Sequence, residues 1–167
     1  KYNYITVYMR RWKTEFTKVM IDTFIDDVNN KKKDEMKFIK DVKSDKTGIQ
    51  IKKEDGIWRY AFYFVPLTMA QKLKSSFNPE NIREIDFDEY VPLDGRYAPE
   101  EMFNILEFWN TCDRKRNIVK FCTFGNRITA SNPFLNFFGV EIKIDDKFKT
   151  RLYKNGQLMV NIYHNEE

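Results

Sequence analysis

The sequence predicts a layered α/β domain, in which helices cover the faces of a sheet. Strand-like runs alternate with segments of helical periodicity along most of the chain. Hydrophobic residues make up 42% of the composition and aromatic residues 16%, which is enough apolar material for a core. A length of 167 residues is that of one domain of ordinary size.

The N-terminal half begins with a strand at residues 4–9. Trp12, Phe16, Met20 and Phe24 then recur at helical spacing and predict an amphipathic helix that ends at about residue 30. Proline at position 66 closes a long aromatic strand. The segments expected after the first helix are β-like runs at 36–39, 49–51 and 57–65, a turn at 54–56, and a short helix at 67–77.

The C-terminal half continues the alternation. Pro99 followed by Glu100 and Glu101 is a favoured helix start, because acids there face the positive end of the helix dipole. The other segments expected are strands at 82–88 and 119–124, a short aromatic segment at 133–138, and a meander at 140–144, 148–153 and 158–163. The hairpins at 36–65 and 140–163 are interpreted as additions to a core of residues 1–139, with 140–167 as a C-terminal extension.

Composition excludes several classes of function. The net charge of +4 and the pI of about 8.9 are compatible with a nucleic-acid partner but do not require one. No apolar run reaches the roughly 18 residues of a membrane span, and the first residues do not resemble a signal peptide. Cys112 and Cys122 lack a motif, which favours a reduced, intracellular compartment. His164 is the only histidine, which argues against a zinc site or a histidine triad.

The acid pair Asp88–Glu89 directly follows the predicted strand 82–88. Ligands of open α/β sheets bind at the carboxyl ends of strands, so Asp88 is a candidate for holding magnesium and Glu89 for polarising water. An acidic surface turn explains the same two residues. Glu84 and Asp86 lie inside the strand, where a fully buried strand would be apolar.

Other polar residues follow strands or helices. Asn126 is placed to touch a phosphate or orient water, although Gly-Asn is also a common turn. Arg114 or Arg116 could act as an arginine finger, or form a solvated basic turn at a helix end. Arg10 and Arg11 could bind phosphate, adenine or DNA backbone, or simply begin a helix.

The order of these motifs resembles that of the DNA-encapsidation ATPases of small short-tailed phages. The resemblance runs from Tyr4 to about Gly139, and "SNPFLNFFG" after "FGN" is its most specific part. The matching stretches are "YITVYMRRWKTEF", "FVPLTMAQKLKSS", "IDFDEYVP", "NTCDRKRNIVKFCTFGNRIT" and "SNPFLNFFG".

The resemblance implies a three-layer P-loop-type core of the additional-strand, catalytic-glutamate class, which uses ATP and Mg²⁺. On this basis Asp88 matches the Walker B aspartate that holds the metal, and Glu89 the catalytic glutamate. Arg114 matches the arginine that completes a neighbouring subunit's site. Asn126 matches the polar sensor on the adjacent strand.

The resemblance also places Lys74, Arg10 and Arg11 in the cofactor-binding set, with the roles of the two arginines open. The P-loop motif G-x-x-x-x-G-K-[ST] is absent from the sequence. In the family it precedes the strand with which this chain begins, so Lys1 is interpreted as a cut point and the chain as a fragment.

The function implied is that of the ATPase domain of a motor that moves double-stranded DNA into a procapsid. Its expected form is a homo-oligomeric ring, a pentamer, at the portal vertex in the host cytoplasm, with or without a packaging RNA and without a membrane. One alternative is a non-catalytic DNA- or partner-binding module. Another is a metal-dependent nuclease built on Asp86, Asp88 and Glu89.

Overall fold

The computed structural model describes residues 4–73, 78–125, 132–142, 150–154 and 157–161. The chain divides into two compact units, Lys1–Gly125 and Asn126–Glu167, and each is described by itself. The domain boundary expected between residues 139 and 140 stays a prediction. Within the described residues, no helix is both long enough and apolar enough to cross a bilayer.

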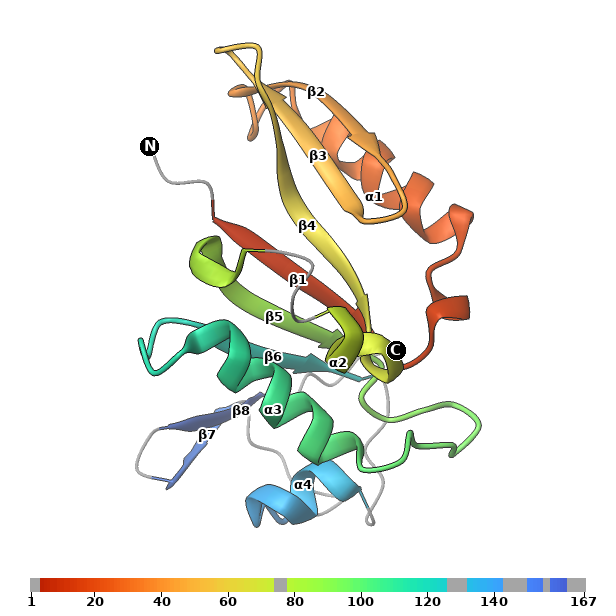
Figure 1. The fold of residues 1–167 in the computed structure, drawn as a ribbon, viewed down its shortest axis with the longest axis vertical. Coiled ribbons are helices and arrows are strands. Elements are labelled where there is room, and N and C mark those ends of the chain that lie inside the picture. Colours follow the sequence, from red (N-terminus) through yellow and green to blue (C-terminus); the bar gives the residue numbers. More distant parts are fainter. Residues whose placement is uncertain (1–3, 74–77, 126–131, 143–149, 155–156, 162–167) are drawn as a thin grey trace. The chain divides into compact units, whose positions relative to one another are not determined.

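The first unit is built on a six-stranded sheet with the strand order β2-β3-β4-β1-β5-β6 (Figure 1). Strands β4, β1, β5 and β6 are parallel to one another, whereas β2 and β3 are antiparallel additions to β4. The strands are β1 (Ile5–Arg10), β2 (Ile39–Ser44), β3 (Gly48–Lys53), β4 (Trp58–Pro66), β5 (Ile82–Asp88) and β6 (Lys120–Phe124).

The segment 36–65 differs from the expected appended hairpin, because its last strand is part of the core sheet. β4 pairs in parallel with β1 from Phe62 to Pro66 and antiparallel with β3 from Trp58 to Tyr63. Its burial changes accordingly, from half-exposed residues at 58–63 to buried Phe64 and Val65. One long strand therefore carries the β2–β3 hairpin outward from the core.

Helices cover both faces of this sheet, which confirms the predicted α/β class. On one face, Tyr8 and Phe64 pack against α1, with 5.2 Å between the ring centroids of Tyr8 and Phe24. The other face carries fully buried apolar side chains from β1 and β5, and α3 packs against β5 there. The helices of this unit are α1 (Lys18–Lys31), α2 (Ala70–Leu73) and α3 (Glu101–Asp113), with 3-10 turns η1 (Lys13–Glu15), η2 (Leu67–Met69) and η3 (Pro79–Asn81).

The first helix begins later than the periodicity predicts, because local capping interrupts it. Thr17 accepts a hydrogen bond from the backbone nitrogen of Met20 at 3.2 Å and so starts α1. Upstream, the Glu15 carboxylate accepts from the backbone nitrogen of Trp12 at 2.6 Å and closes η1. The apolar residues do recur at helical spacing, but they are divided between η1, with its two cap residues, and α1.

The second unit contains α4 (Pro133–Phe138) and a two-stranded sheet of β7 (Thr150–Tyr153) and β8 (Leu158–Asn161). Asn132 is fully buried, and its side-chain oxygen caps α4 by accepting from the backbone nitrogen of Phe134 at 2.8 Å. The strand expected at 140–144 is wrong for residues 140–142, which have no regular structure. Residues 143–149 lie outside the described residues.

Candidate functional site at the carboxyl edge of the sheet

The carboxyl ends of the parallel strands bring the predicted polar residues to one edge of the sheet. Arg10 ends β1 and Arg11 follows it, while Asp88 ends β5 and Glu89 follows it. Because β1 and β5 are adjacent and parallel, these four residues lie at the same edge of the sheet. Ligands of open α/β sheets bind at this edge.

Arg10 bridges the two acids. Its Nη2 lies 2.5 Å from Oδ2 of Asp88, and its Nη1 lies 3.0 Å from Oε2 of Glu89. The hydroxyl of Tyr8, two residues earlier on the same face of β1, donates to Asp88. The two carboxylates are 26% and 30% exposed, so the cluster is half-buried and its charges are only partly screened by water.

The environment shifts the protonation equilibria of this cluster. Burial raises the pKa of the Tyr8 hydroxyl to about 12, and its hydrogen bond to Asp88 acts in the same direction. Burial alone would lower the pKa of the Arg10 guanidinium, but Tyr8 and the two carboxylates outweigh it and the pKa is raised. Arg10 is therefore charged and Tyr8 neutral at neutral pH.

Glu89 has a left-handed backbone, with φ at 55°. This region is uncommon for a residue with a side chain and costs about 1–2 kcal/mol. Two hydrogen bonds hold the turn: Glu89 donates its backbone N–H to Oδ1 of Asp88 at 3.0 Å, and Tyr90 donates to the carbonyl of Phe124 at 3.0 Å. Strain of this kind persists where the surroundings over-determine it, and functional sites are common among such places.

Arg11 has a different environment from Arg10, because its side chain is 1% exposed. Its Nε and Nη2 donate to the two oxygens of Glu101 at 2.6 and 2.8 Å. Its Nη1 and Nη2 also donate to the backbone carbonyl of Glu89, and Nη2 to that of Tyr90. All three nitrogens are thus engaged within the chain, and Arg11 ties the acid pair's loop to the start of α3.

The carboxylates of Asp88 and Glu89 are hard oxygen donors, the ligand type that Mg²⁺ prefers. Their position at the sheet edge and their partial exposure fit a metal ion that also contacts a phosphate. Arg10 neutralises both acids in this structure. A metal at Asp88 would require Arg10 to turn to another acceptor, for which a nucleotide phosphate has the right charge.

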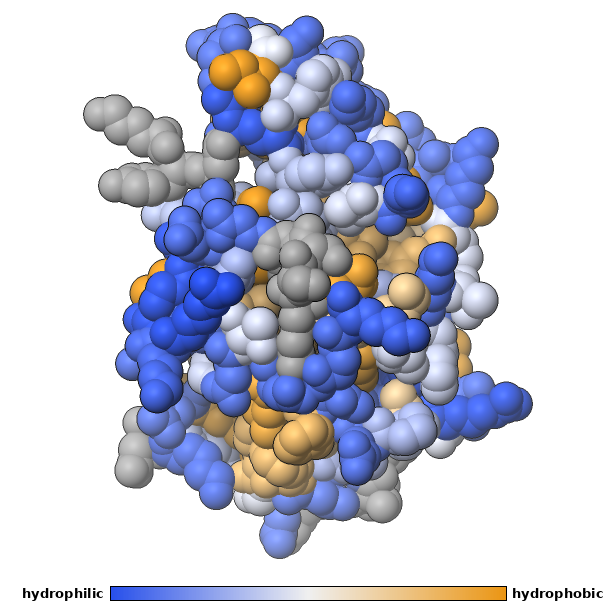
Figure 2. All heavy atoms as spheres, viewed as in Figure 1, coloured by the Kyte–Doolittle hydropathy of each residue, from blue (hydrophilic) through white to orange (hydrophobic). Residues whose placement is uncertain are grey.

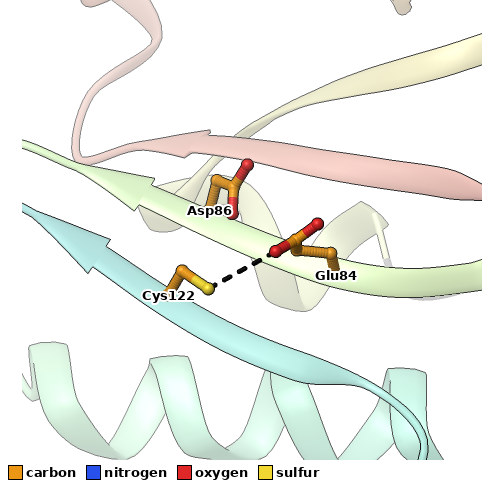
Figure 3. A group of neighbouring side chains, drawn as sticks. All are labelled: Glu84, Asp86 and Cys122. Carbon is orange, nitrogen blue, oxygen red and sulfur yellow. Dashed lines mark hydrogen bonds between the residues drawn. The ribbon is translucent and has the colours of Figure 1, made fainter. Parts of the chain in front are cut away.

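A second group of polar side chains lies on β5 and β6, before the carboxyl ends of these strands. Glu84 and Asp86 point to the same side of β5, and Cys122 points toward them from β6 (Figure 3). The Cys122 thiol lies 3.5 Å from Oε1 of Glu84, and Oδ1 of Asp86 is buried without a hydrogen-bond partner among the described residues. Burial, reinforced by the charges of Glu84 and Asp88, raises the pKa of Asp86 to about 6.

This grouping bears on the nuclease alternative. Asp86 is associated with Glu84 and Cys122, whereas Asp88 and Glu89 are held by Arg10. The three acids of that alternative therefore do not form one cluster in the described structure. The polar residues in β5 are explained by its alternation, since Ile85 and Phe87 are buried on one face and the acids half-exposed on the other.

Arg114 lies at the opposite edge of the sheet from the acid pair. α3 runs back from the carboxyl edge and ends at Asp113, just before β6 begins. Arg114 is exposed, with φ at 49°. Arg116, the other candidate, donates to the carbonyls of Pro79, Glu80, Cys112 and Asp113 and so fastens the end of α3.

Asp113 holds this turn in shape. Its carboxylate accepts from the backbone nitrogens of Asn117, Ile118 and Val119 at 2.9, 2.9 and 3.0 Å. Burial alone would raise the pKa of Asp113, but these donors outweigh it and the pKa is lowered. Arg114 thus lies on a turn held by hydrogen bonds, at a distance from Asp88 and Glu89.

Two predicted site residues, Lys74 and Asn126, lie outside the described residues. β6 ends at Phe124, which is the register partner of Asp88. Gly125 leaves no room for a side chain, because a Cβ there would lie 2.6 Å from the ring of Tyr90.

Sequence reasoning missed two residues of the edge. Tyr8 could have been found from strand alternation, because it lies two positions before Arg10 and so on the same face. Glu101 was interpreted only as an acid in the first turn of a helix. Its pairing with Arg11, 90 residues apart in the chain, has no local signal.

The fold and its edge define the class of protein: an α/β domain with an acid pair at the carboxyl end of a parallel strand. The podovirus DNA encapsidation protein (Gp16) family model matches residues 1–164, and the chain belongs to this family. The DNA packaging proteins of Bacillus phages PZA and phi29 are each 27% identical to it over 150 residues. These matches cover 89% of this chain and 41% of each relative, so the chain spans about two-fifths of their length.

Solved structures show the same fold. The N-terminal domain of the DNA packaging ATPase from bacteriophage phi29 superposes with a TM-score of 0.75 at 24% identity, over 97% of this chain and 76% of that one. The phi-28 gp11 DNA packaging motor superposes with a TM-score of 0.73 at 21% identity, over 99% of this chain and 50% of that one. The predicted resemblance and fold class are confirmed.

Proposed function

We propose that this chain is the part of a DNA-packaging ATPase that carries its hydrolytic acids. The observation that carries the proposal is the pair Asp88–Glu89, held at the carboxyl edge of a parallel sheet in a member of the encapsidation family. The full-length protein would couple ATP hydrolysis to the movement of double-stranded DNA into a procapsid.

The residues take distinct roles in this proposal. Magnesium would neutralise phosphate charge, and Asp88 would hold it, directly or through water. Glu89 would accept a hydrogen bond from the attacking water and orient it. Arg10 would turn from the two carboxylates to a phosphate oxygen when nucleotide binds, which frees both acids. Tyr8, neutral at ordinary pH, would keep the Asp88 carboxylate oriented meanwhile.

Arg114 would act in trans. It lies at the edge of the sheet opposite Asp88, so a single subunit cannot bring the two together without unfolding α3 or β6. In a ring of identical subunits one protomer's Arg114 can face the next protomer's acids. We propose such a ring, a pentamer, at the portal of the procapsid in the host cytoplasm, with Lys74 and Asn126 as further nucleotide-site residues.

The test is the variant Glu89→Gln in the full-length protein. It keeps the side-chain volume and the hydrogen bond to Arg10 but cannot take a proton, so ATP turnover should fall by about 10²–10⁴-fold. Binding of ATP, measured with a fluorescent analogue, should stay nearly unchanged. Glu54→Gln, an exposed acid on the hairpin, is the matched control and should leave both quantities alone.

Unchanged turnover in Glu89→Gln would refute the assignment of Glu89. A wild-type protein that binds DNA but shows no turnover would instead support the non-catalytic binding module. For Arg114→Ala, the expected result is loss of turnover that mixing with Glu89→Gln subunits partly restores. Such complementation arises only if adjacent protomers share a site.

A further inference from the structure

The positive charge of this chain is concentrated in one segment. Residues 31–59 contain ten basic and six acidic side chains, a net charge of +4. The whole chain also has a net charge of +4, so the other 138 residues are balanced, with nineteen of each sign. The segment comprises the end of α1, the β2–β3 hairpin and the start of β4.

The fold brings these lysines together at one end of the sheet. Lys32, just after α1, donates to the backbone carbonyl of Lys40 at the start of β2 at 3.3 Å. Lys43 on β2 and Lys52 on β3 both lie over the ring of Trp58, at 4.2 and 5.9 Å from its centroid. Figure 2 shows mostly hydrophilic side chains, with a hydrophobic group among them, at this end of the first unit, where β2, β3 and β4 extend beyond the core.

Most acids of the segment are already engaged. Asp55 pairs with Arg59 at 2.7 Å, and Glu54 with Lys40 at 3.3 Å. Asp45 accepts from the Tyr60 hydroxyl at 2.8 Å, as well as from Gln50 and two backbone nitrogens. Asp41 lies opposite Lys52 in the strand register but accepts from its neighbour's backbone nitrogen.

Lys43 and Lys52 have no carboxylate partner among the described residues. Trp58 is half-buried, and its ring supports the two ammonium groups through cation–π contacts. Such a contact is worth about 0.5–1 kcal/mol at an exposed site and leaves the positive charge uncompensated. These ammonium groups can therefore bind a phosphate oxygen without first breaking an ion pair.

We propose that this basic end, residues 31–59 with Lys43, Lys52 and Trp58 at its centre, binds the phosphodiester backbone of a nucleic acid. The recognition is independent of sequence, because lysines here contact phosphates and not base edges. The surface is separate from the acid pair. The binding needs neither ATP nor hydrolysis, so the failure of one proposal leaves the other standing.

The test uses the full-length protein, without ATP, and a short fluorescent DNA duplex of random sequence. Affinity is measured by anisotropy at a series of salt concentrations for the wild type and for Lys43→Gln/Lys52→Gln. Each phosphate contact contributes about 0.9 to the slope of log affinity against log salt, so the double variant should lose about 2 from the slope. The control Lys18→Gln/Lys120→Gln removes the same charge outside the segment and should keep the wild-type slope.

A parallel series with an RNA duplex of the same sequence shows whether DNA or RNA is the preferred ligand. Tighter binding of either duplex supports the proposal. Two results would overturn it. One is an equal loss of slope in the test and control variants, which would reflect net charge alone. The other is that the protein binds neither duplex. Binding to vesicles of anionic phospholipid instead would also contradict the proposal.

Discussion

The buried pair of Arg11 and Glu101 offers the sharpest test of how the carboxyl edge is held. Arg11 is 1% and Glu101 5% exposed, and two hydrogen bonds of 2.6 and 2.8 Å join them. Glu101 also accepts from the backbone nitrogen of Ala98 at 2.7 Å. Removal of one partner leaves a buried charge without its oppositely charged partner.

Arg11→Met should therefore lower the free energy of unfolding by about 3–5 kcal/mol, and so should Glu101→Leu, because each strands the opposite charge. The double variant Arg11→Met/Glu101→Leu removes both charges and keeps the volume. Its stability should exceed that of either single variant, but stay below the wild type because Ala98 and the carbonyls of Glu89 and Tyr90 lose hydrogen-bond partners. The coupling energy between the two side chains should then be several kcal/mol. Urea denaturation followed by circular dichroism measures all four proteins.

The matched control is the exposed pair of Lys40 and Glu54, 55% and 75% exposed at 3.3 Å. Glu54→Gln should change stability by less than about 0.5 kcal/mol, because water screens that pair. If Arg11→Met cost no more than Glu54→Gln, or if the double variant were as unstable as the two single changes combined, the reasoning about a buried ion pair would be refuted.

Three further changes test other parts of the structure. The pKa of Asp86 is raised to about 6 in the fold against about 3.9 in an unfolded chain, so its protonation stabilises the fold at low pH, and this stabilisation is lost as the pH rises through about 6. Asp86→Asn should remove that pH dependence and, after a discount for partial exposure, raise stability at pH 8 by about 1 kcal/mol; urea midpoints at pH 5 and pH 8 that shift in parallel for both proteins would contradict this. Asp113→Ala should cost about 2–3 kcal/mol in thermal denaturation, because three backbone donors lose their acceptor. Gly48→Ala should cost at least about 3 kcal/mol, since its Cβ would lie 1.9 Å from the carbonyl oxygen of Phe62, whereas Gly56→Ala, with open space but φ at 76°, should cost only about 1 kcal/mol by the same assay.

Local signals predicted most of the first unit. β5 ends at Asp88 as expected, and β6 ends at Phe124 before Gly-Asn, because apolar alternation and turn residues are properties of neighbours in the chain. Two of the errors concern local structure. The helix expected from residue 12 is divided by the cap at Thr17, and the strand expected at 140–144 has no regular structure where it is described.

The candidate site was predictable in its members but not in its contacts. Asp88 and Glu89 were found because they follow an apolar strand, and Arg10 because it follows another. Their ion pairs depend on β1 and β5 being neighbours in the sheet. No local pattern in the sequence predicts which strands pair. The two arginines look equivalent as "RR", yet one is half-buried on the acid pair and the other fully buried on Glu101.

The residue order was sufficient for the class of fold, the ends of the strands and the acid pair, since each depends on spacing along the chain. Tertiary structure alone decided which side chains meet across the sheet. Strand alternation sends Arg10 and Arg11 to opposite faces, and parallel pairing then brings Asp88 and Glu89 to Arg10. The end of α3 carries Arg114 to the far edge, because a helix that connects two parallel strands must run back across the sheet.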